Sequence, residues 1–139
     1  MRHAAVFVLA AAILAGLAVP RVAPAAEGGK PPAEVLKVTT PDLPKEPTGE
    51  LRVYHATLGP GEATPWHTHP APVVVYVVRG TLVLEVQGKP PAEARAGQAI
   101  LEPTNVALRA RNGDKRRPVE AVIFQAAGPG QPFFQPAQK

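Results

Sequence analysis

Two histidines separated by one residue, His67 and His69, have the clearest capacity for chemistry in this chain. In an extended backbone, residues i and i+2 point to the same face, so both imidazole rings can converge on one point. Neutral imidazole is the commonest side-chain ligand of metal ions in proteins. The two histidines therefore indicate the beginning of a metal site. Two histidines at this spacing also arise by chance on protein surfaces.

The composition removes several other kinds of chemistry. The chain has no cysteine, so thiolate metal ligands and cysteine nucleophiles are excluded, and disulfides cannot stabilise the domain outside the cytosol. The sequence also contains no phosphate-binding glycine loop, nucleophile elbow or Ser-His-Asp signature. What remains is chemistry, or binding, that depends on the histidine pair.

The N-terminal segment predicts a signal peptide. A basic start, Met1 to His3, precedes an uncharged apolar run from Ala4 to Val19 and the small residues Ala23-Pro24-Ala25. We expect residues 1–25 to be removed, by cleavage after Ala25 or Ala26, from a protein that is periplasmic or secreted. A retained N-terminal anchor is the alternative.

Cleavage would also lower the net charge. It removes two of the fifteen basic residues, Arg2 and Arg21, and none of the eleven acidic ones, so the formal charge falls from +4 to +2. Such a charge gives little attraction to polyanions. We expect no nucleic-acid partner and, after signal cleavage, no membrane span. We interpret the basic cluster Arg109, Arg111 and Lys115-Arg116-Arg117 as a solvated hairpin rather than a site for an anionic small molecule or lipid.

The chain divides into an arm, a domain and a tail. Residues 26–48 are rich in proline and glycine and predict an arm or linker in which only Val35 to Val38 forms a short strand. Residues 49–127 carry the domain. Residues 128–139 form a Pro/Gln-rich tail, and the rings of Phe133 and Phe134 either cover the domain or a partner subunit or belong to a disordered tail.

The domain shows the alternation of β-strands. From Leu51 to Leu58, two sets of residues alternate with the period of two that is typical of a strand. Leu51, Val53, His55 and Thr57 form one set, and Arg52, Tyr54, Ala56 and Leu58 form the other. The β-branched run Val73 to Val78 and the alternating segment Thr81 to Gln87 flank Arg79-Gly80, which predicts a hairpin with a tight glycine turn. Shorter strands are expected at residues 98–102, 106–111 and 119–125. This pattern predicts an all-β sandwich or barrel.

The spacing of several residues resembles the two motifs of the cupin superfamily. The first motif, G-x5-H-x-H-x3,4-E-x6-G, is matched by Gly61, His67, His69 and Gly80, and the second, G-x5-P-x-G-x2-H-x3-N, by Gly97, Pro103 and Asn112. The resemblance extends from about residue 50 to residue 127. It implies a single cupin jelly-roll, or double-stranded β-helix, barrel that binds a small molecule and forms a homodimer.

Two ligand positions of these motifs are aliphatic in this chain. Metal-dependent cupins that this chain resembles hold iron, manganese, nickel, copper or zinc with three histidines and one glutamate. Here Val73, or Val74 in the longer spacing, stands at the carboxylate position, and Leu108 stands at the third histidine position. Asn105 replaces the glycine of the second motif, a mild change because asparagine tolerates positive φ.

Three interpretations of the histidine pair follow. In the leading one, the metal site is reduced to His67 and His69, and the aliphatic residues extend the apolar interior. In the second, another residue supplies a ligand; the candidates are His55, which we expect to be a core or rim histidine, and Glu102, which we expect to be exposed to solvent. In the third, a ligand molecule or a second subunit completes the site.

The sequence accordingly predicts an exported cupin-domain protein that binds a small molecule and has a reduced, two-histidine metal site. The alternative is a metal-dependent enzyme, of the dioxygenase or isomerase type, on a small organic substrate; a purely structural protein is a third hypothesis. The sequence does not decide whether the protein is an enzyme, or whether it holds a divalent transition metal or no cofactor.

Overall fold

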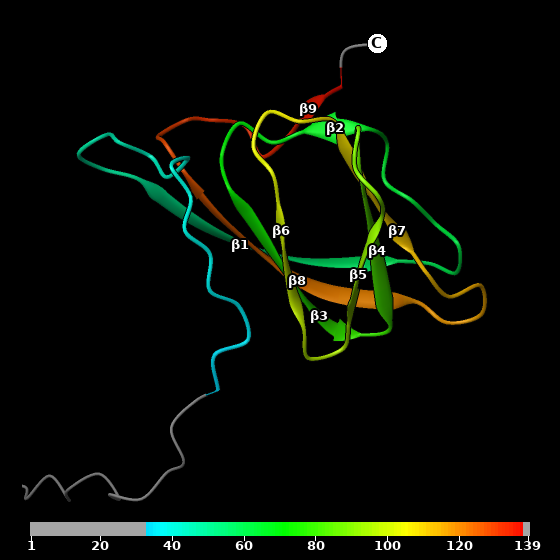
Figure 1. Ribbon diagram of the computed structural model, residues 1–139. Coiled ribbons are helices and arrows are strands. Elements are labelled where there is room, and N and C mark those ends of the chain that lie inside the picture. The colour runs from blue at the N-terminus through cyan, green and yellow to red at the C-terminus, as the bar shows by residue number, and fades with distance from the viewer. Residues whose placement is uncertain (1–32, 138–139) are drawn as a thin grey trace, which may run out of the picture. The chain divides into compact units, whose positions relative to one another are not determined.

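The computed structural model describes residues 33–137, and every regular element in this range is a β-strand. The strands, shown in Figure 1, are β1 (Glu50–Leu58), β2 (His67–Thr68), β3 (Val73–Arg79), β4 (Thr81–Val86), β5 (Ala92–Arg95), β6 (Ala99–Glu102), β7 (Leu108–Asn112), β8 (Val119–Ala127) and β9 (Gln135–Pro136). The predicted all-β class is confirmed. No helix in the described range is long and apolar enough to cross a membrane, and the predicted signal peptide, residues 1–25, lies outside this range.

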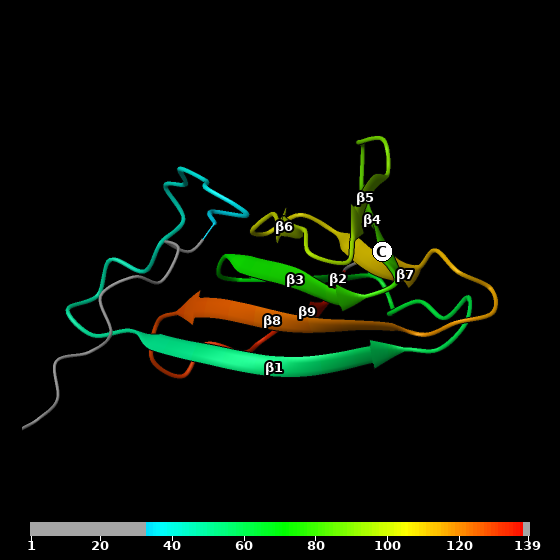
Figure 2. The same cartoon turned by 90° about the horizontal axis from the view of Figure 1, so that it is seen from below.

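The strands form two antiparallel sheets. One has four strands in the order β1-β8-β3-β6, and the other has five in the order β5-β4-β7-β2-β9. The 90° view in Figure 2 shows β1, β8 and β3 of the first sheet side by side. Two antiparallel sheets that share a buried core are the architecture of β-sandwiches and jelly rolls.

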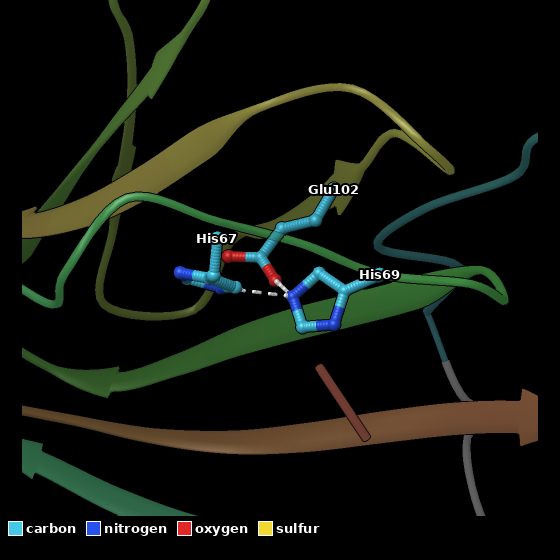
Figure 3. Close-up of side chains that lie close together, drawn as sticks. All are labelled: His67, His69 and Glu102. Carbon is cyan, nitrogen blue, oxygen red and sulfur yellow. Dashed lines mark hydrogen bonds and ion pairs between the residues drawn. The ribbon is translucent and has the colours of Figure 1, made fainter. Parts of the chain in front are cut away.

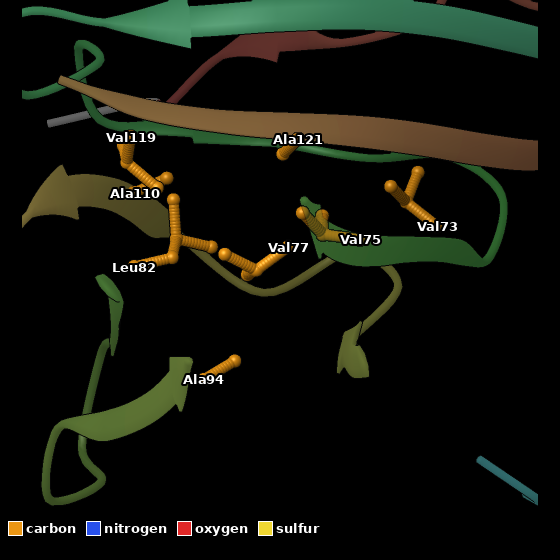
Figure 4. Close-up of a cluster of buried hydrophobic side chains, with 8 residues drawn as sticks. All are labelled: Val73, Val75, Val77, Leu82, Ala94, Ala110, Val119 and Ala121. Carbon is orange, nitrogen blue, oxygen red and sulfur yellow. The ribbon is translucent and has the colours of Figure 1, made fainter. Parts of the chain in front are cut away.

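The core lies between the sheets and is built largely by alternate residues of β3. Val73, Val75 and Val77 are 0%, 2% and 0% exposed, because successive side chains of a strand point to opposite faces. Figure 4 shows these three valines beside small and medium-sized side chains from both sheets. Those partners are Leu82, Ala94, Ala110, Val119 and Ala121.

The predicted hairpin at Arg79-Gly80 is wrong. The strands on either side do not pair: β3 pairs with β6 and β8, whereas β4 pairs with β5 and β7. Gly80 is instead the corner at which the chain passes from one sheet to the other. Its φ is +85°, and a Cβ there would lie 3.0 Å from the carbonyl oxygen of Pro118, so this corner requires glycine.

The predicted strand at residues 35–38 is also wrong, because residues 33–49 contain no strand. This arm instead lines a groove on the outer face of the four-stranded sheet. The outer face is itself apolar: Leu51, Val53 and Phe124 are 88%, 63% and 47% exposed. Apolar residues therefore occupy both faces of this sheet, and hydrophobicity alone does not tell its inner face from its outer one.

A pair of identical substitutions tests which positions form the core. Leu82→Ala removes side-chain volume from a position that is 3% exposed, whereas Leu51→Ala acts at one that is 88% exposed. We expect the first to lower the free energy of unfolding by about 2–5 kcal/mol and the second to change that of the isolated chain by less than about 0.5 kcal/mol. Urea unfolding of both variants measures this, and equal losses would contradict the assigned faces.

Candidate metal centre

The histidine pair converges as the sequence predicts. His67 lies in β2, where it pairs with Leu108 of β7, and His69 lies just beyond the end of β2. The two Nε2 atoms are 3.1 Å apart, and the ring planes are nearly perpendicular, at 89°. His69 is completely buried and His67 partly so. Both rings therefore face one point inside the protein (Figure 3).

A carboxylate lies within reach of this point, contrary to our expectation. Glu102, the last residue of β6, is 4% exposed, and its Oε2 atom is 2.9 Å from Nε2 of His69. The ligand atoms of His67, His69 and Glu102 all lie within 4.8 Å of one another. The predicted solvent exposure of Glu102 is wrong, and with it the prediction that the site is reduced to two histidines.

The position of Glu102 explains how this site acquires a carboxylate. Antiparallel pairing of β3 and β6 places Glu102 directly opposite Val73, the position at which the first motif expects its glutamate. Residues that oppose each other in a sheet project from the same face. The carboxylate thus reaches the same region from the neighbouring strand. The only signal in the sequence was the place of Glu102 next to Pro103 of the second motif.

His55, the other candidate ligand, is not part of the group. It is exposed on the outer face of β1, which it shares with Leu51 and Val53. We expected a core or rim histidine because those neighbours are apolar. The expectation of a core position is wrong because Leu51 and Val53, whose face His55 shares, point away from the space between the sheets.

Hydrogen bonds to the other ring nitrogens determine the tautomers of both histidines. Nδ1 of His67 lies 2.8 Å from the carbonyl oxygen of Pro65, and Nδ1 of His69 lies 2.7 Å from that of Phe133. A carbonyl oxygen only accepts, so each Nδ1 carries the hydrogen and donates it. In a neutral ring, Nε2 then presents a lone pair. The two Nε2 atoms that face each other are consequently both acceptors.

A positive centre would satisfy this arrangement. The two Nε2 atoms and the carboxylate oxygen are all acceptors, and a single proton can be donated fully to only one neighbour, whereas a divalent cation accepts all three lone pairs. Donor atoms bound to one ion at about 2.0–2.2 Å lie about 3 Å from each other. The separations of 3.1 Å from His67 to His69 and 2.9 Å from His69 to Glu102 match this spacing, and all three ligand atoms lie within 4.8 Å of one another. The three residues therefore fit a metal ion.

The group opens onto a small apolar cavity. The cavity has a volume of about 90 Å³ and is lined by side chains of both sheets and by Phe133. Among its described lining residues, Glu102 is the only one with a charged side chain. An uncompensated buried carboxylate is costly. A cation beside Glu102 would offset that cost and leave its remaining coordination positions directed at the cavity.

The donor set indicates which chemistry is available. Three protein ligands with an open position are typical of catalytic zinc sites, and two histidines with one carboxylate are typical of non-haem iron sites. The hydrogen bonds from both Nδ1 atoms to carbonyl oxygens are the outer interactions that orient histidine ligands. The buried group has the composition and the support of a metal centre.

The fold and this site define a class: an all-β protein of two antiparallel sheets with a buried His-His-Glu group between them. The family profile described as "Cupin domain" matches residues 54–124, just over half of the chain. The chain belongs to the cupin family. No curated protein sequence matches it.

Solved structures agree with this assignment of the fold. DMSP lyase DddQ from Ruegeria pomeroyi DSS-3 is 22% identical with a TM-score of 0.55, and the match covers 63% of this chain and 43% of that one. An RmlC-like cupin family protein from Methanocaldococcus jannaschii, described as having a double-stranded β-helix fold, is also 22% identical, with a TM-score of 0.52 and coverage of 70% and 95%. The chain thus spans less than half of the lyase.

The basic cluster predicted from the sequence lies away from the cavity. Glu85 of β4 accepts hydrogen bonds from Arg109 at 2.6 Å and from Arg111 at 3.1 Å. These two bonds, that from Arg109 above all, hold the pKa of the Glu85 carboxyl below its ordinary value of 4.5. Both arginines are therefore held within their own sheet by Glu85, which offsets one of their two charges.

The lowered pKa of Glu85 gives a pH-dependent contribution to stability. It is present above the ordinary value of 4.5 and is lost as the pH falls through the lower pKa of the folded state. We expect Glu85→Gln to reduce the free energy of unfolding at pH 7 and the difference from the unaltered protein to shrink in acid. Urea unfolding across this range measures it; a difference that stays constant with pH would refute the assignment.

Proposed function

We propose that this cupin binds a divalent transition metal through His67, His69 and Glu102, and a small molecule in the adjoining cavity. The proposal rests on one observation: the ligand atoms of His67, His69 and Glu102 converge, and the Nδ1 atoms of both histidines are already hydrogen-bonded to carbonyl oxygens. We further propose that the two sheets close into the jelly-roll barrel expected of the family. The proposed site therefore has three protein ligands, where the sequence predicts two histidines.

Each residue has a separate task in this proposal. His67 and His69 supply neutral nitrogen ligands because their Nδ1 hydrogens are held by Pro65 and Phe133. Glu102 supplies a negative charge that lowers the net charge of the bound cation. When bound, the metal would act as a Lewis acid that polarises an oxygen of the small molecule. The aliphatic residues at the other two motif positions, Val73 and Leu108, keep the region dry, since both are 0% exposed.

The cavity limits the kind of molecule that fits. Its volume of about 90 Å³ is smaller than the cavity of about 150 Å³ that holds benzene in an engineered protein. The lining is apolar except at the metal group and Thr64. We therefore infer a molecule of few non-hydrogen atoms, with one oxygen group for the metal and a short apolar body.

A metal-dependent enzyme is the second candidate, and the two-histidine, one-carboxylate donor set favours it. Binding and turnover separate the candidates. Metal-loaded protein would be incubated with small carboxylic acids that carry short apolar bodies, with His69→Ala as the inactive control. Product formation lost in the variant would establish an enzyme, whereas saturable binding without conversion would support a binding protein.

Metal content tests the proposal directly. We expect protein expressed with supplemented transition metals to retain about one ion per chain. Glu102→Gln should lower its affinity at least tenfold, because even outer partners of a metal ligand are worth about 10–100-fold. Elemental analysis and competition with a chelator measure both quantities.

The matched control is Glu120→Gln, which removes a carboxylate paired with Arg79 on the surface. It should leave the metal content unchanged. Unaltered protein that carries no stoichiometric metal after supplementation would reject the proposed function. Equal affinities of the unaltered protein and Glu102→Gln would remove Glu102 from the site.

We also propose that the protein is exported, with residues 1–25 removed, and is a homodimer. The apolar run and small-residue site of the N-terminal sequence support export. The exposed apolar residues Leu51, Val53 and Phe124 support an interface on the four-stranded sheet.

Native mass spectrometry of protein recovered from the periplasm or medium tests both proposals. It should detect a dimer of chains that begin after Ala25 or Ala26. Val53→Lys should give monomers, because it places a charge in the apolar face. A full-length chain in that fraction would contradict cleavage, and a monomeric unaltered protein at micromolar concentration would contradict the dimer.

A further inference from the structure

The C-terminal strap, residues 128–137, lies against the histidine pair. Its β9 strand pairs with β2, so that Pro136 opposes His67 and Gln135 opposes Thr68. The ring of Phe133 lines the cavity and lies 5.0 Å from the ring of His69, and the ring of Phe134 lies 5.5 Å from that of His67. The strap therefore forms one wall of the metal centre.

The backbone of the strap also holds a metal ligand in place. The carbonyl oxygen of Phe133 accepts a hydrogen bond from Nδ1 of His69 at 2.7 Å and one from Nε2 of Gln125 at 3.1 Å. Gln125 is 1% exposed, so its amide is shielded from bulk solvent. The position of this carbonyl determines which nitrogen of His69 faces the cavity.

The two histidines differ in this respect. The acceptor for His67 is the carbonyl of Pro65, two residues upstream, whereas the acceptor for His69 lies sixty-four residues away in sequence. Local backbone geometry provides the first acceptor. The second exists only while the strap is docked.

An ionic latch docks the strap onto β1. Nη1 of Arg52 donates to the carbonyl of Gln131 at 2.6 Å and to Oε1 of Gln125 at 3.2 Å, and its guanidinium also pairs with Glu50. Glu50 accepts a hydrogen bond from the backbone N–H of Gly130 at 3.0 Å. That N–H and Arg52 hold the pKa of Glu50 below its ordinary value, as expected of a carboxylate kept charged by its partners. Two charged side chains thus hold the strap at two backbone sites.

Packing adds to the latch. The ring of Phe133 lies 4.4 Å from that of Tyr54, which projects from the same face of β1 as Arg52. The ring therefore fills the space between β1 and His69, and separates the metal group from the latch.

We propose that the C-terminal strap is the positioning element of the metal centre: the carbonyl of Phe133, which accepts a hydrogen bond from Gln125 in a segment that Arg52 holds at Gln131, keeps His69 as an Nε2 ligand. This inference rests on the proposed function, since it assigns a role toward the metal. The strap acts through His69 and contributes no ligand of its own. Its loss should weaken metal binding and leave the three ligands present.

The test compares Co²⁺ binding by the unaltered protein, two truncations and variants of Arg52 and Arg79. A truncation that ends at Gly128 removes the strap, Arg52→Met removes the latch, and a truncation that ends at Ala137 leaves the described strap intact. Arg79→Met, an exposed arginine paired with Glu120, is the control for Arg52→Met. Circular dichroism and thermal unfolding establish which forms are folded.

We expect the Gly128 truncation to weaken Co²⁺ affinity about 10–100-fold, the effect of losing an outer partner of a metal ligand. Arg52→Met should weaken it by a smaller factor, and Arg52→Lys should restore part of the loss. The Co²⁺ affinities of the Ala137 truncation and of Arg79→Met should stay within about twofold of that of the unaltered protein, well below the effect of losing an outer partner. Titration followed by the visible absorption of Co²⁺ measures these affinities.

A folded Gly128 truncation with affinity within twofold of the unaltered protein would overturn the proposal. If that truncation does not fold, Arg52→Met decides by the same criterion. Nitrogen-15 NMR of the His69 ring in metal-free protein gives a second reading, because the strap predicts a hydrogen on Nδ1 that becomes delocalised between the nitrogens when the strap or latch is removed.

The NMR reading also separates the two proposals. If the unaltered protein binds no Co²⁺, the proposed function fails on its own. In that case the strap would still be shown to orient His69 if the hydrogen lies on Nδ1 in the unaltered protein but not in the variants that lack the strap or the latch. A His69 tautomer that is the same with and without the strap would reject the strap whatever the metal result.

Discussion

In the buried group of His67, His69 and Glu102, lone pairs on neighbouring atoms face and repel one another. His67 and His69 each give their Nδ1 hydrogen to a carbonyl oxygen, so their Nε2 atoms face each other as acceptors at 3.1 Å. The carboxylate of Glu102 adds a third acceptor and a negative charge. A cation between them would turn three repelling groups into three ligands. The rest of the fold can be understood as the framework that holds these atoms together.

The register of the paired strands sets the positions of these residues. The pairing of β2 with β7 places His67 beside Leu108, and the pairing of β3 with β6 places Glu102 beside Val73. A slip of one residue in β6 would turn Glu102 to the opposite face of its sheet, because side chains alternate. The core opposes such a slip, since it would also turn Ile100, which packs against the core cluster, to the other face. Core packing and site geometry are therefore enforced by the same register.

The site also extends beyond the residues that face the cavity. Phe133 contributes a ring to the cavity wall and a carbonyl to His69, and Arg52 and Glu50 on β1 hold the segment that carries it. None of these groups is a metal ligand. Outer interactions of this kind fix ligand orientation and are part of what a metal centre needs.

The sequence by itself determined the fold class and the histidine part of the site. Alternation predicted an all-β domain, and the i, i+2 spacing of His67 and His69 predicted converging rings, because both properties follow from the local geometry of an extended chain. The prediction of a hairpin at Gly80 was wrong because it also used local geometry alone. A local turn does not reveal whether the strands beside it belong to one sheet or two.

Only the tertiary structure decided the rest. The inward position of Glu102 depends on its register with Val73, twenty-nine residues earlier in the chain, and the Nδ1 acceptor of His69 comes from Phe133 at the other end of the domain. The outward position of His55 depends on which apolar face of β1 meets the second sheet. Each of these facts is a long-range contact, and such contacts are set by how the sheets pack rather than by the residues near them in sequence.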